Sequence, residues 1–298
     1  MRVKVIINPA AGQPEPILSV LNDAFAPGGI DWDVAITHKA GDGAIAAREA
    51  AAKGYDLVAA YGGDGTVTEV ASALAEGGPP ILLLPGGTGN ALAEDLGIPL
   101  ALAEAAALVN GDVSEIRKVD LGRCGDRWFV LRLTMGLEAA MVAAATRELK
   151  DRYGWLAYAF AGMQAISAAP MATYSITADD KAAECEGIAA LIANSASMGI
   201  AGTRIADDVS VSDGLLDLVV VKQTDLPGLL GIAAAAAQER PSPLLSRWRG
   251  KEIHVEANPQ QTVLADGEEG GSTPVTASIV PCALGVVVPR PTGRDAVA

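Results

Sequence analysis

The chain has 298 residues, of which half are hydrophobic and 19% are charged, and its 22 Lys and Arg against 36 Asp and Glu give a net charge of −14. Such an apolar composition excludes an intrinsically disordered chain, and the length suffices for two domains. The negative charge argues against nucleic acid as a partner, because phosphate backbones repel an acidic protein. Three scattered cysteines indicate a reducing, cytoplasmic environment, and no apolar run is long enough to span a bilayer.

The first part of the chain alternates apolar strands with helices. Strands are predicted over Val3–Ile7, Asp31–Ile36, Asp56–Ala60 and Ile81–Leu84, and helices over Pro16–Ala26, Gly43–Lys53 and the residues after Thr66 and after Gly89. The third helix has one apolar face, formed by Val67, Val70, Ala71 and Leu74. This alternation indicates a parallel sheet covered by helices on both faces, whose ligand lies beyond the carboxyl ends of the strands.

After Asn110 the pattern changes to an antiparallel β domain with helical insertions. Strands are predicted over Val119–Cys124, Trp128–Met135, Thr173–Thr177, Ile188–Ala193, Leu215–Val221, Ile253–Glu256, Thr262–Ala265 and Val275–Val280. Two helical intervals interrupt them, Leu137–Ala168 and Pro227–Arg247. We therefore predict two domains, 1–121 and 122–298, with no flexible linker between them.

Three strands of the first domain end in glycine-containing loops, Asn8–Gly12, Tyr61–Thr66 and Leu84–Asn90. Glycines let the backbone approach a ligand and turn its N–H groups toward phosphate, and the helix that follows adds its positive end. Asp64 would repel a phosphate unless a divalent cation lay between them, which predicts a nucleotide with Mg²⁺. A single such loop is equally well read as a tight turn with Asp64 or Thr66 as the helix cap. Three at one sheet edge favour a binding site.

The motifs in these loops resemble those of a known family. Asn-Pro-x-x-Gly at Asn8–Gly12, Gly-Gly-Asp-Gly-Thr at Gly62–Thr66 and Pro-Gly-Gly-Thr-Gly-Asn at Pro85–Asn90 are similar to the diacylglycerol kinase catalytic domain, and more closely to small bacterial lipid kinases related to diacylglycerol and sphingosine kinases. Further matches follow in order at Gly136–Val142, Gly154–Tyr158, Asp213–Leu218 and Asp266–Glu268. The resemblance therefore spans nearly the whole chain.

The resemblance implies a Rossmann-like, phosphofructokinase-like α/β domain with a parallel sheet that binds the nucleotide, and a C-terminal antiparallel β-sandwich with helical insertions that binds the lipid. It leaves open that the C-terminal tail returns to the first domain. The implied activity is transfer of the γ-phosphate of ATP to a lipid hydroxyl. The implied nucleotide contacts are Asn8, Gly12, Thr37, Gly62, Gly63, Asp64, Gly65, Thr66, Thr88 and Asn90. Thr37 taken alone could equally be the cap of the helix before Gly43.

A carboxylate in the second domain is the candidate catalytic base. Asp266-Gly-Glu268 follows a predicted strand, so it also fits a simple hairpin tip. Phosphoryl transfer to an alcohol, however, needs a carboxylate that orients the hydroxyl and accepts its proton. The resemblance assigns this role to Glu268, with Asp266 as the second candidate, while Glu269 is expected to be merely solvated.

The resemblance also implies a structural Mg²⁺ site, from which this chain departs. The corresponding ligands would be Ser210, the Asp213 carboxylate and the Leu215 carbonyl, with Ser210 standing where the family has Asp. A serine is a poor substitute for a carboxylate on a hard cation. We therefore expect this site to be weakened, unless Asp207 or Asp208 compensates. Glu138, where the family pattern has Asp, keeps the charge.

A basic stretch, Arg240–Lys251, includes Trp248 and suits a membrane surface, although a short surface helix rich in cations explains it as well. The expected partners are ATP and a lipid substrate at the membrane, with a homodimer left open, and the expected location is the cytoplasm with transient contact at the inner membrane face. Two rival functions remain. An NAD kinase shares Gly-Gly-Asp-Gly, and a non-catalytic nucleotide or lipid sensor could keep the same fold.

Overall fold

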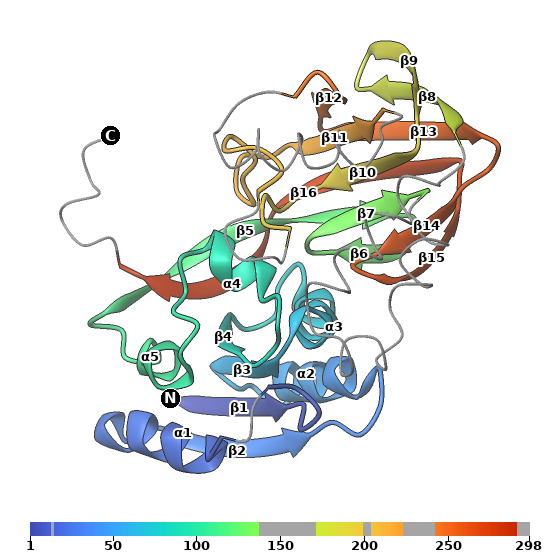
Figure 1. The fold of residues 1–298 in the computed structure, drawn as a ribbon. Helices are drawn as coiled ribbons and strands as arrows, with labels where there is room; N and C mark the ends of the chain where they lie inside the picture. The colour runs from blue at the N-terminus through green and yellow to red at the C-terminus, as the bar shows by residue number, and fades with distance from the viewer. Residues whose placement is uncertain (13–14, 137–170, 199–203, 223–241, 291–298) are drawn as a thin grey trace, which may run out of the picture.

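The computed structural model describes residues 1–12, 15–136, 171–198, 204–222 and 242–290. Figure 1 shows an α/β half, which contains the N-terminus, and a second half built mainly of strands. Two sheets, one of ten strands and one of six, account for the described strands. One hydrophobic core fills the α/β half, and a second lies between the sheets of the other half.

The α/β half has the predicted alternation of strands and helices. Its elements are β1 (Arg2–Ile7), α1 (Ile17–Phe25), the 3₁₀ turn η1 (Ala26–Gly28), β2 (Asp31–Ile36), α2 (Asp42–Ala52), β3 (Leu57–Gly62), α3 (Asp64–Leu74), β4 (Ile81–Pro85), α4 (Ala91–Asp95) and α5 (Leu102–Ala107). The strands run parallel in the order β2-β1-β3-β4. Every residue of β3 and β4 is buried, because helices cover both faces of the sheet. The predicted apolar face of α3, Val67, Val70, Ala71 and Leu74, is buried as well.

The second half is antiparallel, as predicted. Its strands are β5 (Ser114–Cys124), β6 (Arg127–Phe129), β7 (Arg132–Met135), β8 (Ala172–Ala178), β9 (Lys181–Gly187), β10 (Ala189–Ala193), β11 (Leu216–Val221), β12 (Leu245–Gly250), β13 (Glu252–Asn258), β14 (Thr262–Ala265), β15 (Glu268–Ser272) and β16 (Val275–Pro289). The six-stranded sheet has the order β12-β11-β10-β7-β14-β15. It faces β8, β13 and β16 across the second core, which gives the predicted sandwich.

The ten-stranded sheet runs through both halves of the molecule. β16 pairs antiparallel with β13 and β5, and near its end, at Val286, it pairs in parallel with Ile81 of β4. Figure 1 shows β5 and β16 crossing together from one half to the other. The predictions Val119–Cys124 and Val275–Val280 were therefore too short. β5 begins at Ser114 and β16 continues to Pro289, because the two strands remain paired beyond a register shift after Val280.

One predicted helix is partly wrong. Leu245–Arg247, the end of the predicted helix Pro227–Arg247, belongs to strand β12, so the basic stretch is not a surface helix where the structure describes it. Strand β9 was not predicted, because Lys181–Gly187 contains only small and polar residues. The predicted helix Leu137–Ala168, the family segments at Glu138 and Gly154–Tyr158, and the rest of Pro227–Arg247 lie outside the described residues.

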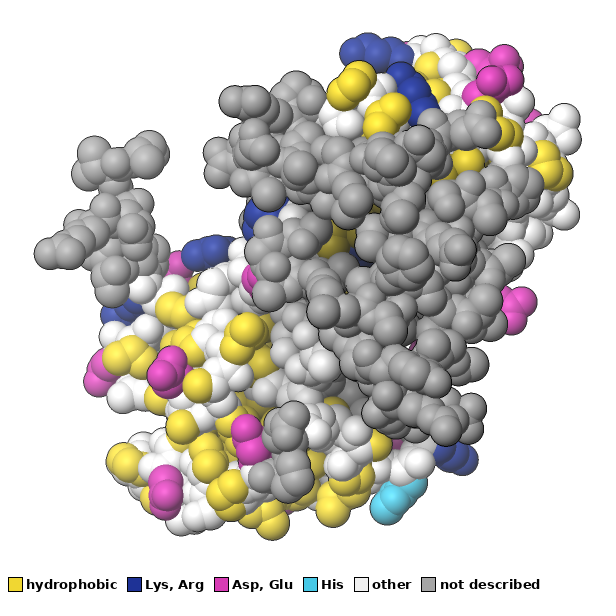
Figure 2. Space-filling view, viewed as in Figure 1, with side chains coloured by type: hydrophobic (Ala, Val, Ile, Leu, Met, Phe, Trp, Pro, Cys, Tyr) yellow, Lys and Arg dark blue, Asp and Glu magenta, His cyan; other side chains and the backbone are white. Residues whose placement is uncertain are grey.

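On the face in Figure 2, hydrophobic and acidic side chains are interspersed over the α/β half. Among the helices that the structure describes, none combines the length and apolar character that crossing a bilayer requires.

Candidate active site

The three glycine loops meet where the strand order reverses. From β1 the chain moves to β2 on one side and then to β3 on the other, so the carboxyl ends of β1 and β3 flank a switch point, the usual ligand site of such sheets. Asn8, after β1, donates its side-chain amide to Thr66 Oγ1 of α3 at 3.1 Å. The loop after β4 joins the group through Gly86, whose N–H donates to the Gly62 carbonyl at 2.9 Å.

A cavity of about 450 Å³ lies at this edge of the sheet. Its lining residues are Asn8, Pro9, Ala10, Thr37, His38, Lys39, Ala40, Gly65, Thr66, Glu69 and Glu268. The cavity thus brings four predicted nucleotide contacts together with the predicted base, which comes from the other sheet. The remaining predicted residues, Gly12, Gly62, Gly63, Asp64, Thr88 and Asn90, belong to the same loops but are not among its lining residues.

Close packing explains two glycines of these loops, Gly62 within its own loop and Gly87 against the neighbouring loop. A Cβ on Gly62 would lie 2.4 Å from Thr66 Oγ1, and one on Gly87 would lie 2.5 Å from the Cα of Gly63. Gly65 is different, because a Cβ there would meet no atom within 4 Å. Gly65 stands in the first turn of α3, where Ala would favour the helix more. Contacts within the protein therefore do not explain this glycine. A ligand does, because it can enter the space that a side chain would fill.

Of two predicted contacts that could have local structural roles, Asn90 has one and Thr37 does not have the expected one. Asn90 has φ +54° and closes its own loop, with its side chain accepting the Gly87 N–H at 3.0 Å and donating to the Gly87 carbonyl at 2.8 Å. Thr37 does not cap α2. The N-terminus of that helix is instead held by Asp42, whose carboxylate accepts the N–H groups of His38 and Lys39. The Thr37 side chain makes no capping hydrogen bond to α2, and Thr37 lines the cavity.

Asp64 links two of the glycine loops, and its carboxylate is partly buried near the charged side chains of Arg132 and Asp266. Its carboxylate accepts the Ala91 N–H at 2.7 Å, at the start of α4. Burial raises the pKa of Asp64, an effect that this hydrogen bond and the Arg132 guanidinium oppose and Asp266 reinforces. Burial also lowers the pKa of Arg132, against the influence of Asp266, Asp64 and Asp95. A nearby cation stabilises the charged form of such a carboxylate.

Asp266 forms the tip of the predicted hairpin and is fully engaged by hydrogen bonds. Asp266 and Gly267 both have positive φ, and Ala265 pairs with Glu268, as in a two-residue hairpin. The carboxylate accepts three successive backbone N–H groups, from Val130 at 2.7 Å, Leu131 at 2.9 Å and Arg132 at 2.8 Å. It also accepts the hydroxyl of Thr68, in α3, at 3.0 Å. Asp266 thereby attaches the hairpin that carries Glu268 to the helix that begins beside Gly65.

Several residues at the site were missed by sequence reasoning. Glu69, one helical turn after Gly65, accepts the N–H groups of Gly41 and Gly43 and so positions the loop after β2. Its i,i+4 spacing from Gly65 is a signal that could have identified it. Thr68 and Arg132 carry no motif, and their role depends on contacts between the two halves.

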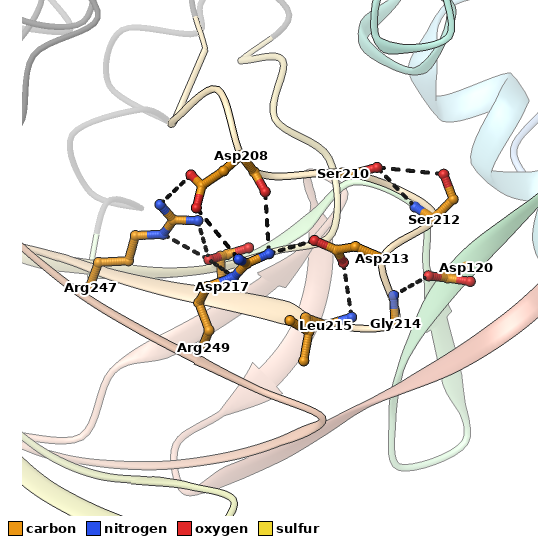
Figure 3. A network of polar contacts seen from close by, with 10 residues as sticks. All are labelled: Asp120, Asp208, Ser210, Ser212, Asp213, Gly214, Leu215, Asp217, Arg247 and Arg249. Carbon is orange, nitrogen blue, oxygen red and sulfur yellow. Dashed lines mark hydrogen bonds and ion pairs between the residues drawn. The ribbon is translucent and has the colours of Figure 1, made fainter. Parts of the chain in front are cut away.

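The predicted structural metal site holds arginines instead (Figure 3). Arg249 contacts the Asp213 carboxylate, whose other oxygen accepts the Leu215 N–H at 3.0 Å. Ser210 makes contact with Ser212 and not with Asp213. In the part of the chain that the structure describes, no group of three His, Cys, Asp or Glu side chains is suited to a metal ion.

Both halves of the chain match models of known protein families. The diacylglycerol kinase catalytic domain model matches residues 2–124, and the model of the YegS C-terminal NAD kinase beta sandwich-like domain matches residues 132–288. A crystal structure of a diacylglycerol kinase from Bacillus anthracis superposes with a TM-score of 0.76 at 25% identity, covering 97% of each chain.

Curated relatives agree with the family models. A diacylglycerol kinase of Bacillus subtilis is 29% identical over 92% of this chain and 91% of its own length. A Pseudomonas aeruginosa protein named "Probable lipid kinase YegS-like" is 34% identical, covering 88% of this chain and 86% of the relative. An uncharacterised Synechocystis protein is 36% identical over 80% of this chain, which spans 56% of that longer protein.

The fold and its relatives define an enzyme, a kinase with an α/β domain and a β-sandwich domain. The chain belongs to the diacylglycerol kinase catalytic-domain family, together with the YegS-like lipid kinases.

The empty space beside Gly65 generates a prediction. Gly65→Val should leave the Tm of the free protein nearly unchanged, because a Cβ at this position meets no atom within 4 Å and Val is no worse a helix former than Gly. It should, however, abolish most of the rise in Tm that ATP and MgCl₂ produce, a stabilisation of about 2.7 kcal/mol at a ligand concentration of 100 Kd. Thermal-shift titration measures both effects.

Gly111→Val is the matched control, because a Cβ at Gly111 also meets open space but lies away from the cavity. Gly63→Val is a less clean probe, since its Cβ would press on the Gly87 Cα at 3.3 Å. A Gly65→Val variant that keeps the full response to ATP would show that the phosphates bind elsewhere.

Proposed function

We propose that this kinase transfers the γ-phosphate of ATP to a hydroxyl group of a lipid, diacylglycerol or a related molecule. The observation that carries the proposal is the cavity that Glu268 shares with Asn8, Thr37 and Gly65. Nucleotide-type loops and a carboxylate from another sheet are the two parts that phosphoryl transfer to an alcohol requires. The names of the relatives, diacylglycerol kinase and lipid kinase, support a lipid as the acceptor.

In this proposal the first domain binds ATP. The contacts are Asn8, Gly12, Thr37, Gly62, Gly63, Asp64, Gly65, Thr66, Thr88 and Asn90. Gly65 leaves room for phosphate at the start of α3, whose N–H groups and positive end attract an anion. Gly62 and Asn90 contribute by shaping the loops, since one packs on Thr66 and the other closes its own turn.

Mg²⁺ would be held by Asp64. The pKa of this carboxylate is raised by burial, so a cation beside it stabilises its charged form. Because the described residues offer no cluster of three ligands, the ion would draw its remaining ligands from phosphates and water, which is common for Mg²⁺. When bound, Mg²⁺ neutralises the charge of the transferred phosphoryl group.

Glu268 is the proposed base. It orients the lipid hydroxyl and accepts its proton as the oxygen attacks the γ-phosphate. Asp266 is better suited to positioning, because its two oxygens already accept four hydrogen bonds. Since the acceptor resides in a membrane, the protein would act from the cytoplasm at the inner membrane face, with the second domain contacting the lipid.

An NAD kinase is the second candidate, favoured by the description of the second family model. A turnover assay with radiolabelled ATP against NAD and a panel of lipids separates the two activities. Phosphorylation of NAD with no lipid product would overturn the proposal. Absence of turnover on both would favour a nucleotide or lipid sensor, against which the position of Glu268 in the cavity argues.

The role of Glu268 yields the sharpest prediction. Glu268→Gln keeps the size and hydrogen bonding of the side chain but removes the base, so turnover should fall at least about a hundredfold. ATP binding, measured by the ATP-induced rise in Tm, should change little, because most of the cavity lining comes from the α/β half. Glu269→Gln is the control and should be nearly silent. A dead Glu269→Gln variant, or an active Glu268→Gln variant, would refute this assignment.

Thr68 is predicted to position the hairpin that carries Glu268. Thr68→Val removes its hydrogen bond to Asp266, and losing a bond to a charged group predicts a roughly tenfold lower kcat. KM for ATP should stay the same, and Thr68→Ser, which retains the hydroxyl, should restore the rate. Equal kcat for the Val and Ser variants would contradict a positioning role.

A further inference from the structure

The segment 207–217 concentrates negative charge at one turn. Its carboxylates Asp208, Asp213 and Asp217 lie close together, and the side chain of Asp217 is only 1% exposed. Carboxylates at such short range repel one another and need a positive charge between them. The resemblance to lipid kinases implies a structural Mg²⁺ at this turn, with ligands at the positions of Ser210, Asp213 and Leu215.

The residues present do not fit a cation at this turn. One oxygen of Asp213 accepts the Leu215 N–H and the other contacts Arg249, so the carboxylate already has a donor on one oxygen and a positive charge on the other. Ser210 provides a neutral hydroxyl, which accepts the Ser212 N–H at 3.3 Å. The Arg249 guanidinium would also repel a divalent ion placed against Asp213.

We propose that the guanidinium groups of Arg247 and Arg249 replace the structural cation in this chain. Arg247 contacts Asp208 at 2.6 Å and donates its Nε–H to Asp217 at 2.7 Å (Figure 3). Arg249 lies 3.1 Å from the same oxygen of Asp217 and 3.4 Å from Asp208. The flat, always charged guanidinium group suits carboxylates on several sides.

Strand pairing delivers both arginines to the carboxylates. β12 pairs with β11 so that Arg249 lies opposite Asp217 and Trp248 opposite Leu218. Because side chains alternate along a strand, Arg247 and Arg249 share one face while Trp248 packs into the second core. The two arginines of the basic stretch that lie in β12 therefore form ion pairs with aspartates of the same chain.

The arginine–aspartate cluster (Asp208, Asp213, Asp217, Arg247 and Arg249) also supports the long strand pair. The Gly214 N–H, at the same turn, donates to Asp120 of β5 at 2.8 Å, and the other oxygen of Asp120 accepts the Cys282 N–H of β16 at 2.8 Å. It follows that this part of the fold needs no metal, so that any requirement for Mg²⁺ comes from the nucleotide. This inference concerns stability and holds whichever acceptor the enzyme uses.

The first test uses the nucleotide-free wild-type protein. After removal of bound metal, its Tm should be the same in EDTA and in millimolar MgCl₂. A clear fall in Tm on adding EDTA, or a rise on adding Mg²⁺, would overturn the proposal. The readout is independent of turnover, so failure of this inference and failure of the proposed kinase activity are distinguishable.

The second test removes the positive charge of Arg249. Arg249→Met should lower Tm by about 5 °C or more, because it removes the cation paired with Asp213 and leaves Arg247 alone to balance the buried Asp217 and its neighbour Asp208. Arg117→Met, at an exposed arginine 3.9 Å from Glu115, should have little effect. The double variant Ser210→Asp with Arg249→Met restores the missing ligand and frees Asp213, so MgCl₂ should raise its Tm. An unchanged Tm for Arg249→Met would overturn the proposal. If Arg249→Met fails to fold, the wild-type comparison in EDTA and MgCl₂ decides.

Discussion

Asp266 joins the two halves of the molecule, because its carboxylate accepts the hydroxyl of Thr68 in the α/β half while three backbone N–H groups of the β half, from Val130, Leu131 and Arg132, hold it in place. An ionised acceptor makes such bonds short and strong. Because Glu268 follows Asp266 by two residues across a tight turn, its reach toward the cavity is set by where Asp266 is held. Loss of this anchor would separate the carboxylate from the loops even if each half kept its fold.

A second carboxylate also joins the α/β half to the β half. Asp95, at the end of α4, accepts the hydroxyl of Ser195, the N–H groups of Ala196 and Ser197, and Arg204 at 3.0 Å. Its side chain is 4% exposed. α3 and α4, which both begin at glycine loops, are thus each attached to the β half by a carboxylate, Asp266 for α3 and the buried Asp95 for α4. The geometry of the nucleotide loops and the position of Glu268 therefore depend on each other.

Local features of the sequence predicted what depends on local physics. The apolar strands, the glycine loops and the buried face of α3 follow from periodicity and turn chemistry, and Asp266–Glu268 was identified from a motif. The role of Arg249 was not predictable, because its partner Asp217 is brought opposite it only by the register of β11 and β12. Arg247-Trp248-Arg249 reads equally well as a cationic helix or as an alternating strand. Glu69 was missed for a similar reason, since its bonds to Gly41 and Gly43 require α2 and α3 to be packed together.

The place of β16 in the ten-stranded sheet constrains how the protein matures on the ribosome. β4 acquires its second neighbour only at Val286, roughly two hundred residues after Ile81 has been synthesised, and β5 also pairs with β16 only after more than a hundred further residues have been made. Until then the nascent nucleotide domain carries an unprotected strand edge, which is prone to pairing with other chains. The last strand that the structure describes is thus also the one that completes the first domain, and newly made molecules need protection from aggregation until it emerges.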